Sequence, residues 1–575
     1  MNNNKIGLFL TSFSLICSGL CCIVDEYILA QLSSNILGNP AQQWPLVIGL
    51  MLFATGVGAW MAQFVSETKT LQAFITIELI LSFLGGFSPL IIMGAYAYAF
   101  VHFKLIFYSI SFIIGLLIGF EQPLIANINK KFVGFRSNIS MTISLDVLGA
   151  AIGTFIWIKF LVGKVEIYHA AFMVTILNLS VALFTYYFLI NYGIENDTDV
   201  PESKKNRSLI WIGLASLIGL GGMYFAGDFA EVSEQQLYTG KIIHKESSPY
   251  QRIVLTKHAK TEDVMMFLNG GLQFCSRDEN RYHENLIHPA MNYHEITSIQ
   301  NKPLDVLVLG GGDGLAVREI RKYNNINSIT LVDLDPAVVN LAKSNPILIE
   351  LNDSSLLKND VKILEAQFPK PEEKESIFMP MDEKDEDGTP LQYFTASVDI
   401  LHEDAYNFVE DVVSLGKKYD LVFIDFPDPR NESLGKLYSK YFFSRVNLLL
   451  KPKGYVAIQA SSPVHAYHAF VCVGKTMTAA GFNVLPYHDN IPSFNEWGWY
   501  LACKQGERLN LHHLAEKMYS LDEFEVETSY LTPKKFFANT VFGKDIIKDV
   551  GEIEISTLSN PKVYHYYVHY GWKIQ

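Results

Sequence analysis

The sequence predicts an α-helical multi-pass membrane domain followed by an α/β domain with a Rossmann-like sheet and a small β-region at its start. Three observations predict this fold class. Apolar stretches long enough to cross a bilayer gather before residue 227. After residue 228, strand-like and helix-like runs alternate. Within them, the apolar run of residues 304–310 leads into a glycine loop.

Seven apolar stretches define the predicted membrane domain, residues 1–227. Their length and composition suit membrane-spanning helices. The first is no cleavable signal, because only Lys5 precedes it and further apolar segments follow. The stretches lie near residues 6–24, 44–65, 72–97, 105–127, 140–162, 167–190 and 208–226.

The remainder of the chain divides into three predicted regions. Residues 228–295 form a small β-strand region, in which the NGG sequence at 269–271 indicates a hairpin turn. Residues 296–510 form the Rossmann-like domain, and residues 511–575 form a C-terminal extension. Within the Rossmann-like domain, the acidic, proline-containing segment 369–390 is typical of a surface insertion.

The glycine loop indicates a nucleoside site. Gly310, Gly311 and Gly312 let a ligand approach the main chain closely, and Asp313 adds a carboxylate. The next strand-like run ends at Asp333, about 20 residues later, which is the spacing at which an acid meets a ribose hydroxyl. A glycine triplet alone would fit an ordinary tight turn equally well. The second strand and its acid favour the nucleoside site.

Further acids follow later strand-like runs. Asp404 follows the run VDIL, Asp425 ends the run YDLVFID, and Asp428 comes three residues on. The carboxyl ends of parallel strands form the ligand crevice of such a sheet, so Asp313, Asp333, Asp404 and Asp425 are expected to converge. With no basic residue in these loops, they predict a pocket for a positively charged substrate. In the alternative interpretation, Asp425 and Asp428 only cap the next helix or make a turn before a proline.

Composition narrows the function classes. The six cysteines show neither the spacing of metal ligands nor a disulfide framework, so no metal site is predicted. The formal net charge of −13 disfavours nucleic acid as a partner and suits cationic ligands.

The motifs together resemble those of the spermidine synthase family of polyamine aminopropyltransferases, in the variant with an N-terminal multi-pass domain. The resemblance runs from Tyr250 to Cys503 and implies an α/β domain of the S-adenosylmethionine-dependent methyltransferase type. It is carried, in order, by the segments YQRIVL, LNGGLQFCSRDENRYHENLIHP, GGGDGLAVREI, VDLDPAVVNLAK, HEDAYNFV and YDLVFIDFPDP.

The resemblance implies roles for the residues that match its motifs. Asp333 would bind the ribose hydroxyls of decarboxylated S-adenosylmethionine, and Asp404 would bind its adenine amino group. Asp313 would meet its aminopropyl ammonium. On the acceptor side, Asp425 would be the general base. The remaining residues would line the nucleoside and amine sites (Gln251 and His283) or hold the acceptor amine (Tyr282 and Asp428).

The implied reaction is a direct displacement. An amine such as putrescine attacks the methylene group next to the sulfonium, and methylthioadenosine leaves with formation of the longer polyamine. Decarboxylated S-adenosylmethionine is a co-substrate, and no metal or redox cofactor is expected. Small molecules and the lipid bilayer are therefore the expected partners, and the resemblance also suggests a homodimer.

Two departures concern the acceptor end. The family's DSSDP or DCTDP segment is DFPDP here, and Phe494 stands where the family has a tyrosine. The loss of a hydroxyl and the gain of Phe426 and Pro427 would alter the choice of amine. Glu496 is a candidate for a replacement charge. The sequence does not identify the acceptor.

Two other functions compete with aminopropyl transfer. A methyltransferase would use intact S-adenosylmethionine, but its carboxylate would lie unfavourably beside Asp313. A polyamine transporter or sensor is suggested by acids in the membrane half, which would bind or conduct polyamine cations. Glu78, Glu121 and Asp146 are expected to lie deep in the membrane and Asp25 and Glu26 at its interface.

The expected location is the cell membrane. With seven crossings, the basic loop residues lie on the side of the N-terminus, so the positive-inside tendency would place the soluble domain outside. Because the nucleoside substrate is made in the cytoplasm, we nevertheless expect a cytoplasmic catalytic domain. These basic residues are Lys69, Lys130, Lys131, Arg136, Lys204, Lys205 and Arg207.

Overall fold

The structure, a computed structural model, divides the chain into two compact units, Met1–Ile243 and His244–Gln575. The units are described separately. The residues described are 3–37, 40–130, 132–162, 164–191, 202–297, 303–364, 397–506, 510–544, 546–547 and 550–571. The predicted acidic insertion at 369–390 lies outside them.

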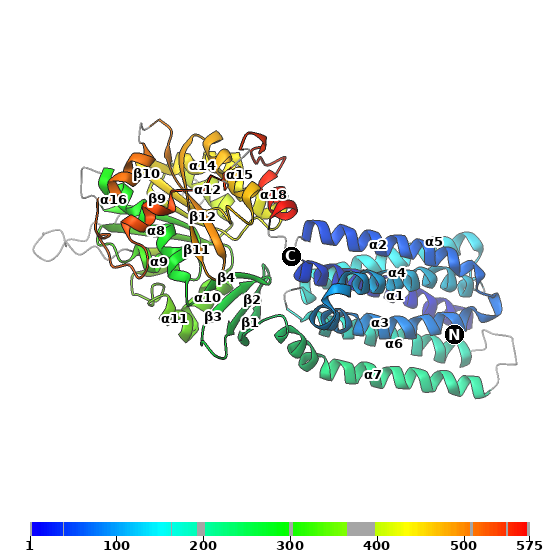
Figure 1. The fold of residues 1–575 in the computed structure, drawn as a ribbon. Coiled ribbons are helices and arrows are strands. Elements are labelled where there is room, and N and C mark those ends of the chain that lie inside the picture. The colour runs from blue at the N-terminus through cyan, green and yellow to red at the C-terminus, as the bar shows by residue number, and fades with distance from the viewer. Residues whose placement is uncertain are drawn as a thin grey trace, which may run out of the picture. The chain divides into compact units, whose positions relative to one another are not determined.

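The first unit is built of seven long helices within its described residues (Figure 1). Each overlaps one of the apolar stretches predicted from the sequence. Helix α1 packs against five of the others, α2, α3, α4, α5 and α6. The helices are α1 (Asn3–Leu37), α2 (Pro40–Met61), α3 (Thr70–Tyr98), α4 (Phe103–Asn129), α5 (Phe135–Ile156), α6 (Ile167–Asn191) and α7 (Glu202–Gln235).

By length and composition, six of the described helices could cross a membrane. The apolar part of α6 that the structure describes, Ile167–Leu183, is shorter than the other six. Many large apolar side chains of this unit point outward, such as Phe53 and Leu217, which are 66% and 69% exposed. Such an apolar outer surface is typical of helices that face lipid.

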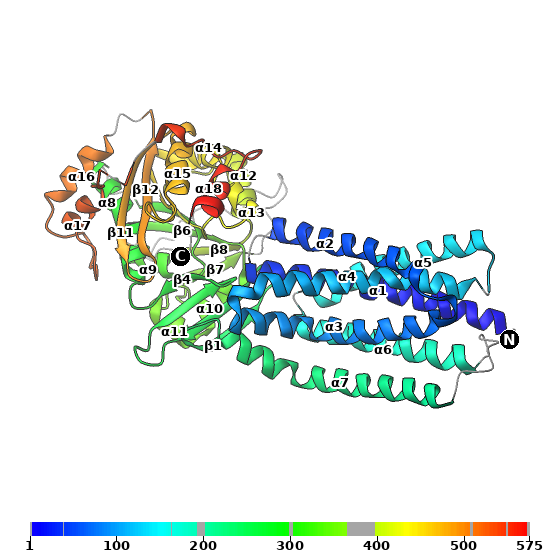
Figure 2. The same ribbon diagram turned by 45° about the vertical axis from the view of Figure 1, so that its right-hand side comes forward.

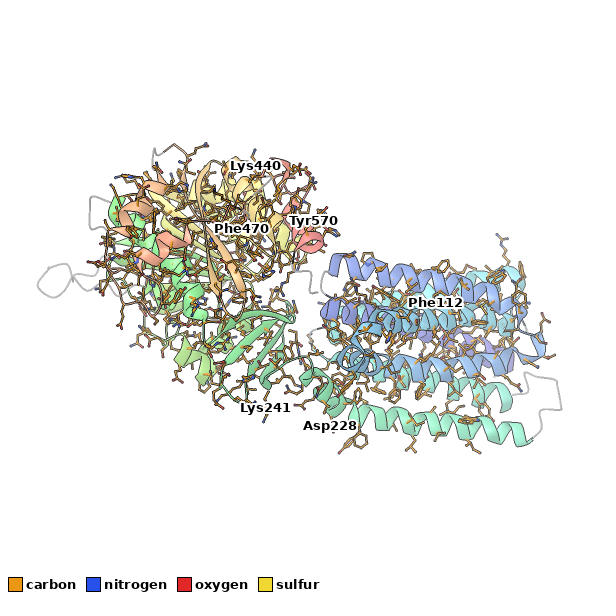
Figure 3. All side chains as sticks on the ribbon, in the orientation of Figure 1. Phe112, Asp228, Lys241, Lys440, Phe470 and Tyr570 are labelled. Atoms are coloured by element: carbon orange, nitrogen blue, oxygen red, sulfur yellow. The ribbon has the colours of Figure 1, made fainter. Side chains whose placement is uncertain are left out.

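Helix α7 continues past the predicted domain boundary at residue 227. It ends at Gln235, and Asp228, labelled in Figure 3, lies within it. The segment after residue 227 is more polar than the one before it, but it contains the helix-forming residues Ala and Glu and no proline. The helix therefore continues through it. Strand β1 (Lys241–Ser247) begins shortly afterwards.

A four-stranded sheet opens the second part of the chain, with strand order β1-β2-β3-β4. Strands β3 (Val264–Leu268) and β4 (Gly271–Cys275) pair antiparallel after β2 (Arg252–Lys257). Asn269 and Gly270 join them with φ values of 49° and 75°. Positive φ at both central residues is the requirement of a tight hairpin turn, so the predicted hairpin is confirmed.

The main sheet has eight strands in the order β11-β12-β10-β9-β5-β6-β8-β7. Figure 2 labels β6, β7, β8, β11 and β12 among them. The six strands from β10 to β7 are parallel, while β12 is antiparallel to both β10 and β11. The sheet is therefore mixed. Its strands are β5 (Leu304–Gly310), β6 (Ile326–Asp333), β7 (Val361–Leu364), β8 (Ser397–His402), β9 (Tyr419–Asp425), β10 (Leu450–Gln459), β11 (Phe482–Ile491) and β12 (Asn495–Lys504).

Alternating side chains of each strand build a core on either face of the main sheet. In β5, Val306 and Val308 join the core formed with α8 (Glu279–Thr297) and α9 (Leu315–Ile320). Leu307 and Leu309 join the opposite core. The helices on that opposite face are α12 (Ala405–Leu415), α14 (Lys440–Leu449) and α15 (Tyr467–Ala479).

Two predicted boundaries in this half differ from the structure. Helix α8 was placed with the small β-region, but its buried face, including Leu286 and Met291, belongs to the core of the main sheet. The segment predicted as a C-terminal extension also packs on this sheet, through α16 (Leu511–Tyr519), α17 (Pro533–Asn539) and α18 (Lys562–Tyr570). Neither boundary coincides with a change in polarity, because the sequences of the buried helices are similar in composition to those of the neighbouring segments.

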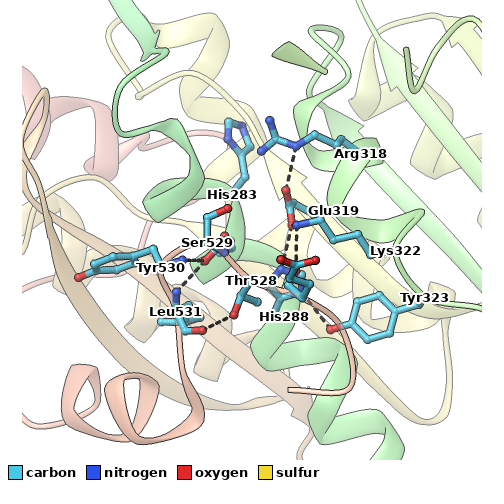
Figure 4. A network of polar contacts seen from close by, with 12 residues as sticks. His283, His288, Arg318, Glu319, Lys322, Tyr323, Thr528, Ser529, Tyr530 and Leu531 are labelled. Carbon is cyan, nitrogen blue, oxygen red and sulfur yellow. Dashed lines mark hydrogen bonds and ion pairs between the residues drawn. The ribbon is translucent and has the colours of Figure 1, made fainter. Parts of the chain in front are cut away.

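Glu284 of α8 fixes the segment that follows α16. This carboxylate is completely buried and accepts three backbone N–H groups, from Ser529 at 2.6 Å, Tyr530 at 3.0 Å and Leu531 at 2.7 Å. Figure 4 shows these three residues beside the polar contacts of α8 and α9. A charged acceptor for three donors compensates for the burial of the carboxylate.

Replacement of Glu284 by alanine is expected to lower the free energy of unfolding of this unit by about 2–4 kcal/mol. Each buried N–H left without an acceptor costs roughly 1–3 kcal/mol, reduced where water can reach it. Thermal unfolding of the purified chain measures the change, with exposed Glu523→Ala as the control. An equal effect of the two substitutions would contradict the structural role of Glu284.

Candidate active site

The parallel strands bring the predicted acids to one edge of the main sheet. In the ladder between β5 and β9, Gly310 lies opposite Asp425. In the ladder between β6 and β8, Asp333 lies opposite His402. Because β9, β5, β6 and β8 are consecutive neighbours, their carboxyl ends are adjacent, as the sequence predicts.

The glycine loop needs glycine for two reasons. Gly310 has φ of +84°, and a Cβ atom there would lie 2.3 Å from the carbonyl oxygen of Asp425. A Cβ atom on Gly312 would lie 2.6 Å from Oδ2 of Asp333. The first position therefore requires an unusual backbone angle, and the second permits the close approach of a carboxylate.

Asp333 is held by the backbone around it. Its carboxylate accepts the N–H of Gly312 and that of Asp335, each at 2.9 Å. Burial raises the pKa of Asp333 to about 6, although these two N–H groups lower it. The group is thus oriented next to the glycine loop, as a ribose-binding acid must be.

Gln251 contacts a neighbouring acid that sequence reasoning missed. Its Nε2 donates to Oδ2 of Asp335 at 2.9 Å, and the hydroxyl of Ser248 donates to the same oxygen at 2.6 Å. Asp335 also accepts the N–H of Ala337 at the start of α10 (Pro336–Ser344). Asp335 therefore ties the small sheet to the strand end that carries Asp333.

Asp425 is paired with Tyr282. The phenol of Tyr282, on α8, donates to Oδ1 of Asp425 at 2.5 Å. Burial raises the pKa of Asp425 to about 6, while the charge of His283 and the hydrogen bond from Tyr282 lower it. A carboxylate with a pKa near 6 can accept a proton close to neutral pH.

His283 introduces a positive charge that the sequence did not predict. Its Nδ1 lies 2.8 Å from Oε2 of Glu279, which Arg318 binds through two N–H groups at 2.8 and 3.0 Å. Burial disfavours the imidazolium, but Glu279 raises the pKa of His283 to about 9. The histidine is therefore charged at neutral pH, and its charge reaches both Asp313 and Asp425.

Asp313 lies at the start of α9. It accepts the N–H of Leu315 at 3.0 Å through Oδ1. Burial raises its pKa, and the charge of His283 lowers it. The sequence prediction considered only the loops, so it missed the positive charge that His283 of helix α8 brings near these acids.

Asp404 is also engaged by a cation. It caps α12 by accepting the N–H of Tyr406 at 2.9 Å, and Nζ of Lys436 lies 2.5 Å from its Oδ2. Lys436 follows the short helix α13 (Glu432–Gly435), which Asn431 caps. Asn431 therefore holds the capping position that the alternative interpretation gave to Asp425 or Asp428.

Asp428 meets a residue from the end of the chain. The hydroxyl of Tyr567, on α18, donates to its Oδ2 at 2.7 Å, while Oδ1 has no hydrogen-bond partner among the described residues. Burial raises the pKa of Asp428, which the charge of Arg430 lowers. No sequence pattern points to Tyr567, because it lies among several tyrosines far from every motif.

The altered acceptor segment is aromatic. The ring of Phe494 lies 6.1 Å from that of Tyr282 and 4.9 Å from that of Trp497, between ring centroids. Glu496, which the sequence suggests as a replacement charge, pairs with His488 on the neighbouring strand β11.

Comparison with known proteins matches residues 279–363 and 377–513 to the family described as "Spermine/spermidine synthase domain". The chain is 33% identical over 555 residues to "Polyamine aminopropyltransferase" of Oceanobacillus iheyensis, covering 95% of this chain and 94% of that one. It is 32% identical over 576 residues to "Polyamine aminopropyltransferase 2" of Aquifex aeolicus, covering 99% and 98%. A spermidine synthase structure from Thermotoga maritima is similar at 19% identity with a TM-score of 0.40, covering 54% and 87%.

Gly312→Ala is expected to weaken binding of methylthioadenosine at least tenfold. The added Cβ would displace the Asp333 carboxylate that lies 2.6 Å from its position. Isothermal titration of the purified chain with methylthioadenosine measures the change. The control is Gly551→Ala, where an added Cβ meets nothing within 4 Å. Unaltered affinity of Gly312→Ala would remove Asp333 and the glycine loop from the nucleoside site.

Proposed function

The chain belongs to the polyamine aminopropyltransferase family, and we propose that the acids at the carboxyl ends of its parallel strands perform the transfer. The enzyme moves an aminopropyl group from decarboxylated S-adenosylmethionine to an amine such as putrescine. Methylthioadenosine and the longer polyamine are the products. The observation that carries the assignment is Asp425, a partly buried carboxylate beside the glycine loop, with a pKa of about 6.

The donor occupies the glycine loop. Gly310, Gly311 and Gly312 allow the nucleoside to approach the backbone, and Asp333 accepts hydrogen bonds from its ribose hydroxyls. Asp313 faces the aminopropyl ammonium. In support of this role, Asp313 and Asp425 interact electrostatically with each other and with His283. The aminopropyl tail of the donor carries an ammonium group and no carboxylate, so its charge is complementary to these acids.

The adenine end lies toward Asp404. In our proposal its carboxylate accepts a hydrogen bond from the exocyclic amino group, while Lys436, at 2.5 Å from Oδ2, orients the acid. Gln251 acts from the other side through Asp335, which it holds at 2.9 Å. Gln251 is therefore a positioning residue for the strand end that carries Asp333.

The chemical step is an in-line displacement. The acceptor nitrogen, freed of one proton, attacks the methylene carbon attached to the sulfonium, and a C–N bond forms as the C–S bond breaks. The electron pair of the broken bond stays on sulfur, so methylthioadenosine leaves as a neutral thioether. Asp425 accepts the proton that the acceptor nitrogen loses.

Tyr282 and His283 support this base. Tyr282 donates to one oxygen of Asp425 at 2.5 Å and leaves the other oxygen for the amine. The imidazolium of His283, held by Glu279, offsets the repulsion between Asp313 and Asp425. Without that charge, two neighbouring carboxylates would resist being ionised together.

Asp428 holds the far ammonium of the acceptor. Its Oδ1 has no hydrogen-bond partner among the described residues, although the group is buried, so it can bind an incoming N–H donor. Tyr567 fixes Oδ2 at 2.7 Å. The length of the preferred amine then follows from the distance between Asp425 and Asp428 and from the aromatic residue Phe494.

The helical unit is the membrane domain of this enzyme. Its support is the set of six described helices that are long and apolar enough to span a bilayer. We place the protein in the cell membrane, with the catalytic unit on the cytoplasmic side, where its nucleoside substrate is made. The expected homodimer rests on the resemblance alone.

The general base sets the expected pH dependence. A base must be deprotonated to act, so kcat/KM for the nucleoside co-substrate, measured at saturating amine, should fall about tenfold per pH unit below pH 6. Above the pKa of Asp425, about 6, this limb should level off. Asp425→Asn should lose about 10²–10⁴-fold in rate, whereas exposed Asp353→Asn should retain it. A full rate in Asp425→Asn would exclude Asp425 as the base.

Tyr567→Phe should raise KM for the acceptor amine about tenfold and leave KM for the nucleoside unchanged. The lost hydrogen bond to a charged group is worth about 1.5–3 kcal/mol. Initial rates of methylthioadenosine release, with each substrate varied in turn, separate the two constants. Tyr570→Phe on the same helix is the control, since Tyr570 is 59% exposed. Equal changes in both KM values would assign Tyr567 a purely structural role.

A further inference from the structure

The interior of the helical unit holds several carboxyl groups and no buried base. Asp25 and Glu26 of α1, Glu78 of α3 and Glu121 of α4 are each between 1% and 4% exposed. No lysine, arginine or histidine in the described part of this unit is buried. Asp25 and Glu26, which the sequence favoured for the membrane interface, therefore lie inside the bundle.

Glu78 is the most unusual of these acids. It is 1% exposed, and neither of its carboxyl oxygens has a hydrogen-bond partner among the described residues. It lies within electrostatic range of Glu121 and of Cys17 and Cys21 on α1. Glu78 therefore faces the region between α1, α3 and α4, where the other acids lie.

The neighbouring acids are only partly satisfied. Glu121 receives a hydrogen bond from the hydroxyl of Ser18, and Asp146 of α5 receives one from Gln122 at 2.6 Å. Asp25 and Glu121 also lie within electrostatic range of each other. A carboxyl group without a partner in an apolar interior is costly in either protonation state, so such groups usually mark a functional site.

The arrangement favours one kind of cation. Among the described residues, no three acidic, histidine or cysteine side chains converge closely enough to hold a metal ion. The acids are instead spread along three helices, at Asp25, Glu78 and Glu121. An extended molecule with ammonium groups separated by methylene chains matches both the spread charges and the apolar walls between them.

We propose that the interior of the helical unit binds a di- or polyammonium cation through Asp25, Glu78 and Glu121, at a site separate from the catalytic one. The need for a cation follows from the buried acids alone. The choice of a polyamine rests in addition on the proposed function, because the acceptor and the product of that reaction are di- or polyammonium cations. The helical unit would then bind the product or acceptor of the catalytic unit of the same chain.

The test measures how many polyamine molecules each chain binds. The full chain in detergent is dialysed to equilibrium against radiolabelled spermidine, without the nucleoside co-substrate. Two spermidine molecules per wild-type chain are expected, and one in the double variant Glu78→Gln, Glu121→Gln. Release of methylthioadenosine by that variant should remain within twofold of wild type. Glu67→Gln is the control, because this side chain of the same unit is 84% exposed and should still bind two.

Other outcomes would overturn the proposal. The proposed site does not exist if the wild-type chain binds only one spermidine, or if the double variant still binds two. Complete displacement of the second spermidine by millimolar Mg²⁺ would also contradict the proposal. If the double variant does not fold, the variant Asp428→Asn provides the test. This variant should still bind one spermidine per chain, and the binding of no spermidine would contradict the proposal. The proposed catalytic function fails separately, if wild type releases no methylthioadenosine.

Discussion

The close approach of three partly buried acids at the ends of parallel strands is the constraint on which the catalytic unit depends. Asp313, Asp333 and Asp425 are each partly buried, and their desolvation raises the pKa of all three. Left alone, such groups would take up protons or push apart. The structure compensates with two backbone N–H groups on Asp333 and with the imidazolium of His283 near the other two. Glu279 keeps that imidazolium charged, and Arg318 in turn binds Glu279.

The sequence predicted those features whose residues lie close together in the chain. The glycine loop, the strand ends at Asp333 and Asp425, and the hairpin at Asn269 and Gly270 all follow from local pattern, and the structure has each of them. The helices of the first unit follow from long apolar runs in the same way. Local pattern says less about where an element ends, so α7 extends beyond the expected boundary.

Features that depend on contacts between distant segments were missed. Arg318 of α9 binds Glu279, the carboxylate that raises the pKa of His283, and no local pattern predicts this contact between two helices. Lys436 reaches Asp404 and Tyr567 reaches Asp428 from segments that carry no recognisable motif. In both halves of the protein, acids that are buried or partly buried are the recurring feature. In the catalytic unit they have cationic and hydroxyl partners, whereas in the helical unit Glu78 has none among the described residues.

The most direct test of the central claim is a product analysis of the full chain with decarboxylated and with intact S-adenosylmethionine. With the decarboxylated compound and putrescine, equal amounts of methylthioadenosine and spermidine should form. With intact S-adenosylmethionine, neither product should appear, because its carboxylate would face Asp313. Formation of S-adenosylhomocysteine and a methylated amine from the intact compound would contradict the account, since it would make the acids at the strand ends part of a methyltransferase.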